Sequence, residues 1–193
     1  MKRLIAAVLC LAALAAGAQE RAIRSTVVVP ASLDEVWAAW TTAEGVKSFF
    51  APDAKVELRV DGPFEVYINP YGEPGMKGGD GMRFLAIQEK KMITFTWNAP
   101  PSLPEVRKQR TYVTVRFKPM GEKATEVTLY HGGWGEGGEW DKAFAYFEKA
   151  WTSVLTSLEA RFAKGPMDWT EWLARMRQMT PVVVEDRAGK ANK

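Results

Sequence analysis

His131 is the only histidine in the 193-residue chain and the first candidate for chemistry. An imidazole can act as a general acid or base near neutral pH, or bind a polar group of a ligand. Alternation along 125–131 places His131 on the same side as Val127 and Leu129. We therefore expect His131 to project into the mouth of any cavity on that side. A hydrogen-bonded structural role is the competing and more common interpretation of a lone histidine.

His131 cannot form a metal site by itself. The sole cysteine, Cys10, lies in the N-terminal apolar stretch, and no carboxylate has a recognisable ligand spacing from the histidine. The chain also lacks the Gly-x-Ser-x-Gly motif of many serine hydrolases. The sequence therefore predicts no metal, no cofactor and no catalytic residue apart from the candidate His131.

The segment 133–138 matches Gly-x-Gly-x-x-Gly, the pattern that binds pyrophosphate between a parallel strand and a helix. Here the preceding strand closes an antiparallel hairpin, and no strand follows the helix. Glu136 and Glu139 would also repel phosphate at the start of that helix. We interpret the segment as a flexible turn into a helix rather than as a nucleotide site.

Two further features combine charge with apolar or aromatic residues. Glu57 and Glu65 could form an acid–base pair across a hairpin, but their alternation with apolar residues predicts a solvent-facing position. The segment 169–179 combines tryptophans with Arg175 and Arg177, which would suit a helix at a membrane surface. Packing of this helix against the domain, or over a cavity, is the favoured interpretation.

The overall composition excludes several classes of protein. A net charge of +3, without a basic run of five or more, excludes an electrostatic nucleic-acid binder. A chain that is 47% hydrophobic and 11% aromatic is not disordered along its length. The length suits one domain of ordinary size with a small appendage.

Residues 1–18 have the features of a secretory signal peptide. The basic pair Lys2-Arg3 precedes an apolar stretch over 4–16, and small residues at 16–18 offer a cleavage site. The stretch is shorter than the about 20 residues that span a bilayer, and Leu9 before Cys10 does not fit a lipoprotein signal. We expect export to the periplasm or the exterior. The mature chain would then lack cysteine and a stable membrane anchor.

Hydrophobic periodicity predicts the elements that position these residues. A strand over 21–29 ends at Pro30, and a Ser32–Glu35 capping box begins a helix. A long amphipathic helix follows Gly138 and stops at 165–166. The other expected elements are a short helical piece at 46–50, hairpins of 56–60 with 64–68, 82–88 with 92–98 and 111–118 with 125–131, loops at 70–81 and after 98, and a short helix at 168–179.

The hairpins demand an antiparallel sheet, so the fold class is α+β. Alternation leaves the sheet with one apolar face, and the long helix has one apolar stripe. Burial of both is achieved when the curved antiparallel sheet wraps around the long C-terminal helix.

This order of elements carries several short motifs. They include Pro30-Ala31-Ser32, Gly62-Pro63-Phe64, Gly81, Thr94-Phe95-Thr96-Trp97, His131-Gly132-Gly133-Trp134 and Ala150-Trp151. Together they resemble the helix-grip fold of the START-like (SRPBCC) superfamily, and within it the family of activator of heat shock protein 90 ATPase homologues. The resemblance covers about residues 22–164. Phe49-Phe50 depart from it, because relatives often have tryptophan there.

The expected organisation follows from the resemblance and the flanking segments. It consists of a signal peptide over 1–18, a START-like domain over 19–165, a short helical extension over 166–180 and a disordered tail over 181–193.

The resemblance also implies a cavity between the sheet and the long helix. The candidate lining residues are Phe64, Tyr67, Phe95, Trp97, Val113, Phe117, His131, Phe147, Trp151 and Leu155. The alternative is that the same residues form a solid core. We expect the partner to be a small hydrophobic or amphipathic molecule, oriented by His131 or Tyr67. Two other functions stay open: a cyclase/dehydrase-type enzyme that uses His131 as acid or base, and a co-chaperone-like ATPase activator.

Overall fold

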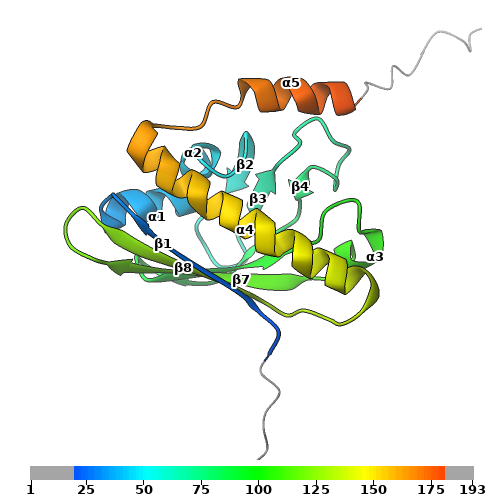
Figure 1. Cartoon of the computed structure of the whole chain (residues 1–193), viewed down its shortest axis with the longest axis horizontal. Coiled ribbons are helices and arrows are strands. Elements are labelled where there is room, and N and C mark those ends of the chain that lie inside the picture. Colours follow the sequence, from blue (N-terminus) through cyan, green and yellow to red (C-terminus); the bar gives the residue numbers. More distant parts are fainter. Residues whose placement is uncertain (1–19, 181–193) are drawn as a thin grey trace, which may run out of the picture.

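The computed structural model describes residues 20–180, in which a curved antiparallel sheet packs around one long helix (Figure 1). The signal peptide expected over 1–18 and the tail expected over 181–193 lie outside the described residues. In chain order the elements are β1 (Ile23–Val29), α1 (Leu33–Thr41), α2 (Ala43–Lys47), β2 (Asp53–Val56), β3 (Phe64–Tyr67), β4 (Gly78–Gly79), β5 (Phe84–Gln88), β6 (Met92–Trp97), α3 (Pro104–Arg107), β7 (Thr111–Pro119), β8 (Thr125–Gly132), α4 (Gly138–Lys164) and α5 (Thr170–Met179).

The strands form two antiparallel sheets, which confirms the α+β class. Five strands have the order β1-β8-β7-β6-β5, and three have the order β2-β3-β4. A backbone hydrogen bond of 2.8 Å from the Phe64 amide to the Met82 carbonyl links the two sheets. The expected single sheet is divided because β3 and β5 are joined through the isolated bridge Pro63–Arg83 rather than through a continuous ladder.

The capping box begins α1 as predicted. The Glu35 carboxylate accepts a hydrogen bond of 2.9 Å from the Ser32 amide, and the Ser32 hydroxyl accepts one from the Glu35 amide. These bonds satisfy two amide groups that the first turn of a helix leaves without partners. The cap therefore sets the direction in which α1 carries its aromatic residues toward the sheet.

The first strand of the first hairpin lies earlier in the chain than the alternation predicts. Val56 pairs with Phe64, so β2 spans Asp53–Val56 instead of 56–60. The Asp61 amide instead donates a hydrogen bond of 3.0 Å to the Phe84 carbonyl, which draws the turn toward β5. Leu58 and Val60 are consequently 41% and 60% exposed. The alternation of apolar and polar residues continues to Val60, although β2 makes no pairs beyond Val56.

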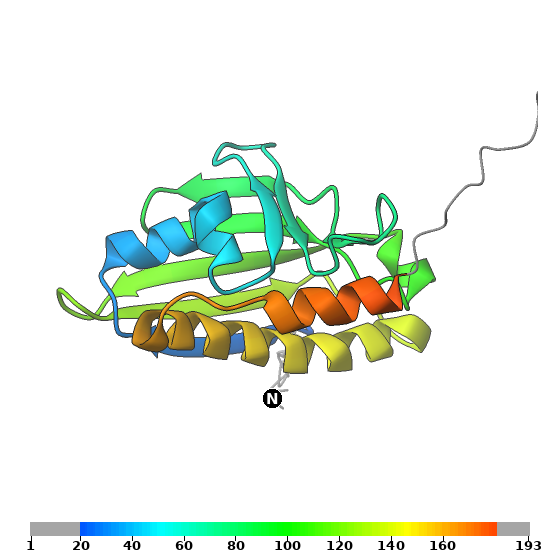
Figure 2. The same cartoon turned by 90° about the horizontal axis from the view of Figure 1, so that it is seen from above.

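The helices occupy one side of the large sheet. The long helix α4 crosses its concave face, while α5 lies beyond it, above α2 and β3 (Figures 1 and 2). The short elements β4 and α3 form inside segments that we expected to be loops. The interpretation of 133–138 as a turn is confirmed, because Gly133, Gly137 and Gly138 adopt positive φ between an antiparallel strand and α4.

Candidate functional site

A pocket of about 250 Å³ lies between the middle of α4, the end of β6 and the segment that follows β3. It reaches solvent near Met76 and Tyr146, which are 48% and 49% exposed. Its lining residues are Phe50, Ile68, Asn69, Met76, Lys77, Gly78, Gly79, Trp97, Asn98, Ala99, Pro100, Pro101, Tyr146, Phe147, Ala150, Trp151 and Val154. The surface offered to a ligand is thus largely apolar and aromatic.

Aromatic rings make one wall of the pocket. Trp97 at the end of β6 lies 5.4 Å from Trp151 of α4, measured between ring centroids. Phe50 stacks on Trp97 at 5.8 Å, and Phe147 stacks on Trp151 at 6.0 Å. Trp97, Phe147 and Trp151 are the three predicted site residues that line this pocket.

Bare backbone of β4 lies directly against the Trp97 ring. A Cβ added to Gly79 would lie 3.1 Å from two ring carbons of Trp97, which is tighter than ordinary van der Waals contact. A side chain here would therefore push the Trp97 ring from its position. The glycine lets β4 approach the indole ring closely.

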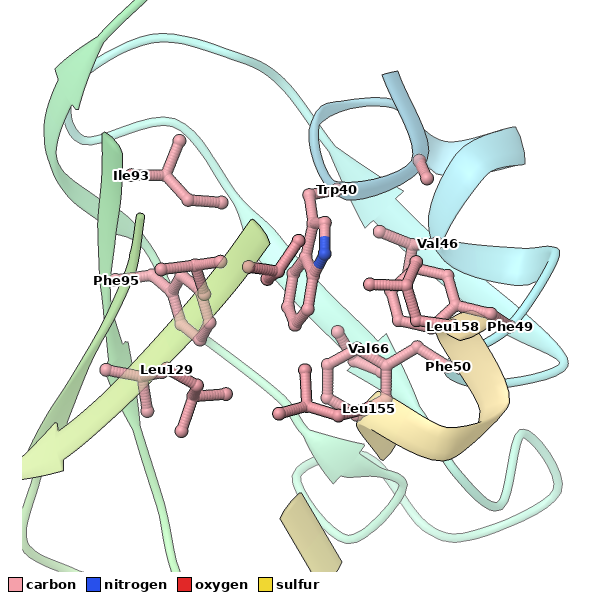
Figure 3. Close-up of a cluster of buried hydrophobic side chains, with 14 of the residues drawn as sticks. Trp40, Val46, Phe49, Phe50, Val66, Ile93, Phe95, Leu129, Leu155 and Leu158 are labelled. Atoms are coloured by element: carbon pink, nitrogen blue, oxygen red, sulfur yellow. The ribbon is translucent and has the colours of Figure 1, made fainter. Parts of the chain in front are cut away.

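Five predicted cavity residues lie in the solid core instead. Figure 3 shows why for Phe95 and Leu155, since Trp40, Phe49 and Phe50 from the region of α1 and α2 occupy the space around them. Trp40 is completely buried and packs edge-on against Phe49 at 5.1 Å. The five predicted cavity residues that are buried in the core and do not line the pocket are Phe64, Phe95, Val113, Phe117 and Leu155.

Tyr67 lies on the other face of β3. Val66 is completely buried, so alternation turns its neighbour Tyr67 outward. The Tyr67 hydroxyl donates a hydrogen bond of 2.7 Å to Glu65, and the Lys77 ammonium lies 5.4 Å from the Tyr67 ring centroid. Burial and the neighbouring Glu65 raise the pKa of Tyr67. The expectation that Tyr67 orients a ligand in the cavity is wrong on this geometry.

His131 is completely buried and does not line the pocket. Its Nδ1 lies 2.8 Å from the Trp151 indole nitrogen, and its Nε2 lies 2.7 Å from the Thr111 hydroxyl. Because an indole N–H only donates, Nδ1 must accept and Nε2 must carry the proton. Burial lowers the pKa of His131 to about 3. The expected position at the cavity mouth is therefore wrong, and the imidazole is a neutral structural group.

The hydrogen bonds of His131 connect two residues of the aromatic wall that come from different elements, Trp151 of α4 and Trp97 of β6. Trp151 donates to the imidazole, the imidazole donates to Thr111, and the Thr111 hydroxyl donates to the Trp97 carbonyl at 3.3 Å. All three side chains are buried, so each unmade bond would carry a desolvation cost. His131 thus holds the positions of Trp97 and Trp151 without contacting the pocket.

A buried arginine organises the rim of the pocket. The Arg107 guanidinium donates to the carbonyl groups of Gly75, Gly78 and Ala99, and lies 3.2 Å from the Asp80 carboxylate. The Asp80 carboxylate in turn accepts hydrogen bonds of 3.1 and 2.8 Å from the Gly75 and Gly78 amides. Burial lowers the pKa of Arg107, and the charge of Asp80 opposes this effect. Since Gly78 and Ala99 line the pocket, this ion pair fixes two of its edges.

The helix α5 packs against the domain beside the pocket. The Trp172 indole donates a hydrogen bond of 2.7 Å to the Ile68 carbonyl, and the Trp169 indole donates one of 2.6 Å to the Lys47 carbonyl. Thr180 accepts a bond of 2.9 Å from the Asn69 amide group. Both Ile68 and Asn69 line the pocket, so α5 supports one of its walls. This agrees with packing against the domain rather than with a free amphipathic surface.

The remaining predicted features are distributed over the surface. Glu57 is exposed and pairs with Arg59 at 3.1 Å, whereas Glu65 is half-buried beneath the Tyr67 hydroxyl. Within residues 20–180, no group of three or more His, Cys, Asp and Glu side chains could hold a metal ion. No helix in the same range has the length and apolar character needed to cross a bilayer.

Sequence reasoning missed several lining residues. Tyr146, Ala150 and Val154 repeat at a spacing of four beside the stripe of Phe147 and Trp151, and this second stripe could have been recognised on the helix. Pocket residues from irregular segments, such as Met76, Asn98 and Pro101, carry no comparable signal. Their positions depend on how the Arg107 cluster folds two loops together.

A curved antiparallel sheet around a long C-terminal helix, with an apolar pocket between them, defines the helix-grip class of START-like proteins. Residues 30–163 match the family described as Activator of Hsp90 ATPase homolog 1-like protein, and the chain belongs to this family. The extension that carries α5 lies beyond the matched residues. A search of curated protein sequences finds no match.

Solved structures share this fold. A protein from Mesorhizobium loti is 17% identical with a TM-score of 0.59, over 76% of this chain and 100% of that one. The Aha1 dimer from Colwellia psychrerythraea is 20% identical with a TM-score of 0.58, over 75% and 98%. An Hsp90 activator from Plasmodium falciparum is 16% identical with a TM-score of 0.53, over 76% and 97%. At these identities the likeness shows the fold alone.

Proposed function

We propose that this protein binds a small hydrophobic or amphipathic molecule in the pocket between α4, β4 and β6. The observation that carries the proposal is the aromatic wall of Trp97, Phe147 and Trp151, which faces an open space of about 250 Å³ instead of closing on it. An apolar surface that stays accessible in a folded domain is typical of a ligand site. Burial of the ligand's apolar area would supply most of the binding free energy.

The enzyme alternative requires an acid or base at the ligand, and its candidate, His131, has both ring nitrogens engaged in the core. The co-chaperone alternative would rest on the relative from Plasmodium falciparum, whose name identifies it as an Hsp90 activator. The pocket favours ligand binding over either of these functions.

Filling the pocket from α4 is expected to weaken ligand binding. Ala150 lines the pocket on the helix, so Ala150→Leu places three additional carbon atoms in the binding space without disturbing helix propensity. Binding is measured by the increase in fluorescence of N-phenyl-1-naphthylamine, an apolar probe. We expect the Kd to rise at least about tenfold, which corresponds to 1.4 kcal/mol.

The matched control is Ser153→Leu, which adds a leucine to an exposed position of the same helix. It should leave the Kd within twofold of the unsubstituted protein. Equal affinity of Ala150→Leu and Ser153→Leu for the probe would show that binding occurs elsewhere. The proposed function would be contradicted if the unsubstituted protein bound neither the probe nor any apolar compound in a library.

We also propose that the protein acts outside the cytoplasm, supported by the basic start, apolar stretch and small residues of 1–18. The expected result is that protein isolated from its own cells begins at Gln19, as determined by N-terminal sequencing. Isolation of a chain that retains residues 1–18 from the cytoplasm would contradict export and would restore the co-chaperone alternative.

A further inference from the structure

Asn98 provides an unused polar group inside the aromatic pocket. It directly follows Trp97 at the end of β6, lines the pocket and is 6% exposed. Its side-chain amide makes no hydrogen bond to any residue in the range 20–180. A ligand that covered this amide without bonding to it would leave its donor and acceptor unpaired, so the amide favours a ligand that satisfies both.

The Asn98 amide is accessible from the pocket. Within residues 20–180, one side-chain nitrogen, Trp40 Nε1, is sealed from solvent and has no hydrogen-bond partner. The side-chain atoms of Asn98 are not in this situation. The unpaired atoms of Asn98 therefore keep accessible surface, and the pocket is the space that this residue lines. A molecule in the pocket can thus reach them.

Two other polar lining residues, Asn69 and Lys77, are already engaged, and the Tyr146 hydroxyl belongs to a half-exposed side chain at the pocket mouth. The Asn69 amide group donates to Thr180 at 2.9 Å, and its carbonyl oxygen accepts from the Tyr71 amide at 3.1 Å. The Lys77 ammonium lies over the ring of Tyr67, on the outer face of β3. The neighbouring guanidinium of Arg107 is paired with Asp80 and with backbone carbonyl groups. The interior of the pocket therefore offers a ligand the Asn98 amide and no unpaired positive charge.

We propose, on the basis of the ligand-binding function above, that the pocket selects neutral aromatic molecules that carry a carboxamide-type group, and that Asn98 is the specificity-determining residue. A primary or lactam amide presents a donor and an acceptor side by side, which matches the Asn98 side chain. A carboxylate would have to lose its hydration without an unpaired cation to compensate, because Arg107 is already paired with Asp80. A cavity of about 150 Å³ holds benzene, so the pocket's about 250 Å³ suits two fused rings.

Competition against N-phenyl-1-naphthylamine tests this specificity with three probes of the same ring system: 2-naphthamide, 2-methylnaphthalene and 2-naphthoate. We expect 2-naphthamide to displace the dye with a Kd at least about fivefold lower than that of either other probe, the effect of a pair of net hydrogen bonds. Asn98→Leu keeps the branched shape of the side chain and removes the amide. This variant should bind 2-naphthamide and 2-methylnaphthalene with equal affinity.

A second variant, Asn98→Ala, adds no bulk and keeps the test decisive if Asn98→Leu fails to fold. Loss of the preference for 2-naphthamide in the folded variant, with affinity for 2-methylnaphthalene retained, supports the assignment. Persistence of the preference in the variant overturns it. Equal binding of all three probes to the unsubstituted protein overturns the role of Asn98 and leaves the proposed function intact. Absence of dye binding overturns both.

Discussion

Lowering the pH from 7.5 to 5 is expected to decrease the free energy of unfolding by about 2 kcal/mol, through the titration of His131. Burial lowers the pKa of His131 to about 3 in the folded protein, whereas an unfolded chain has the ordinary value of 6.5. The unfolded state therefore binds a proton first as the pH falls. The stabilisation is complete above pH 6.5 and is lost progressively between pH 6.5 and 3.

The interval above pH 5 isolates this residue, because His131 is the only histidine and carboxyl groups titrate mainly below that pH. Urea unfolding at pH 7.5, 6.5, 5.5 and 5 measures the effect. In His131→Gln the same series should be nearly flat. At pH 7.5 this variant should be about 2 kcal/mol less stable, since Trp151 and Thr111 lose a well-placed partner. A wild-type series as flat as that of the variant would contradict burial of a neutral imidazole.

Replacing Arg107 by methionine is expected to cost about 3 kcal/mol in the free energy of unfolding. The apolar side chain fills part of the space but leaves Asp80 as a buried charge without its cation. It also removes the donors to the carbonyl groups of Gly75, Gly78 and Ala99. The pocket rim should loosen, so we expect weaker binding of N-phenyl-1-naphthylamine in addition to the lost stability.

Urea unfolding and the dye titration measure both effects in the same preparation. Arg110→Met is the matched control, because Arg110 is exposed and its loss changes the net charge by the same amount. The control should lie within about 0.5 kcal/mol of the unsubstituted protein. If Arg107→Met were as stable as Arg110→Met, the buried pair would contribute nothing to the fold. If it lost stability but bound the dye normally, Arg107 would not organise the pocket.

Local patterns predicted the order of the elements because each depends on neighbouring residues. The Ser32–Glu35 pair begins α1, and alternation in β6, β7 and β8 identifies the buried face of each strand, including His131. The alternation failed where pairing ends early, as at Val56, because a strand needs a partner as well as a pattern. The expectation for Tyr67 is wrong because its position beside the buried Val66 turns its side chain to the other face of β3.

The fold class, the buried face of each strand and the long helix follow from local sequence patterns, because side-chain periods of two and 3.6 residues are properties of the local chain. The position of the pocket follows from how distant segments pack together. Trp40, Phe49 and Phe50 fill the region around Phe95 and Leu155, whereas the loops tied by the Arg107 cluster leave a pocket beside Trp97 and Trp151. The size of a cavity depends on the volumes of side chains that converge from many elements, and no single segment of sequence contains that sum.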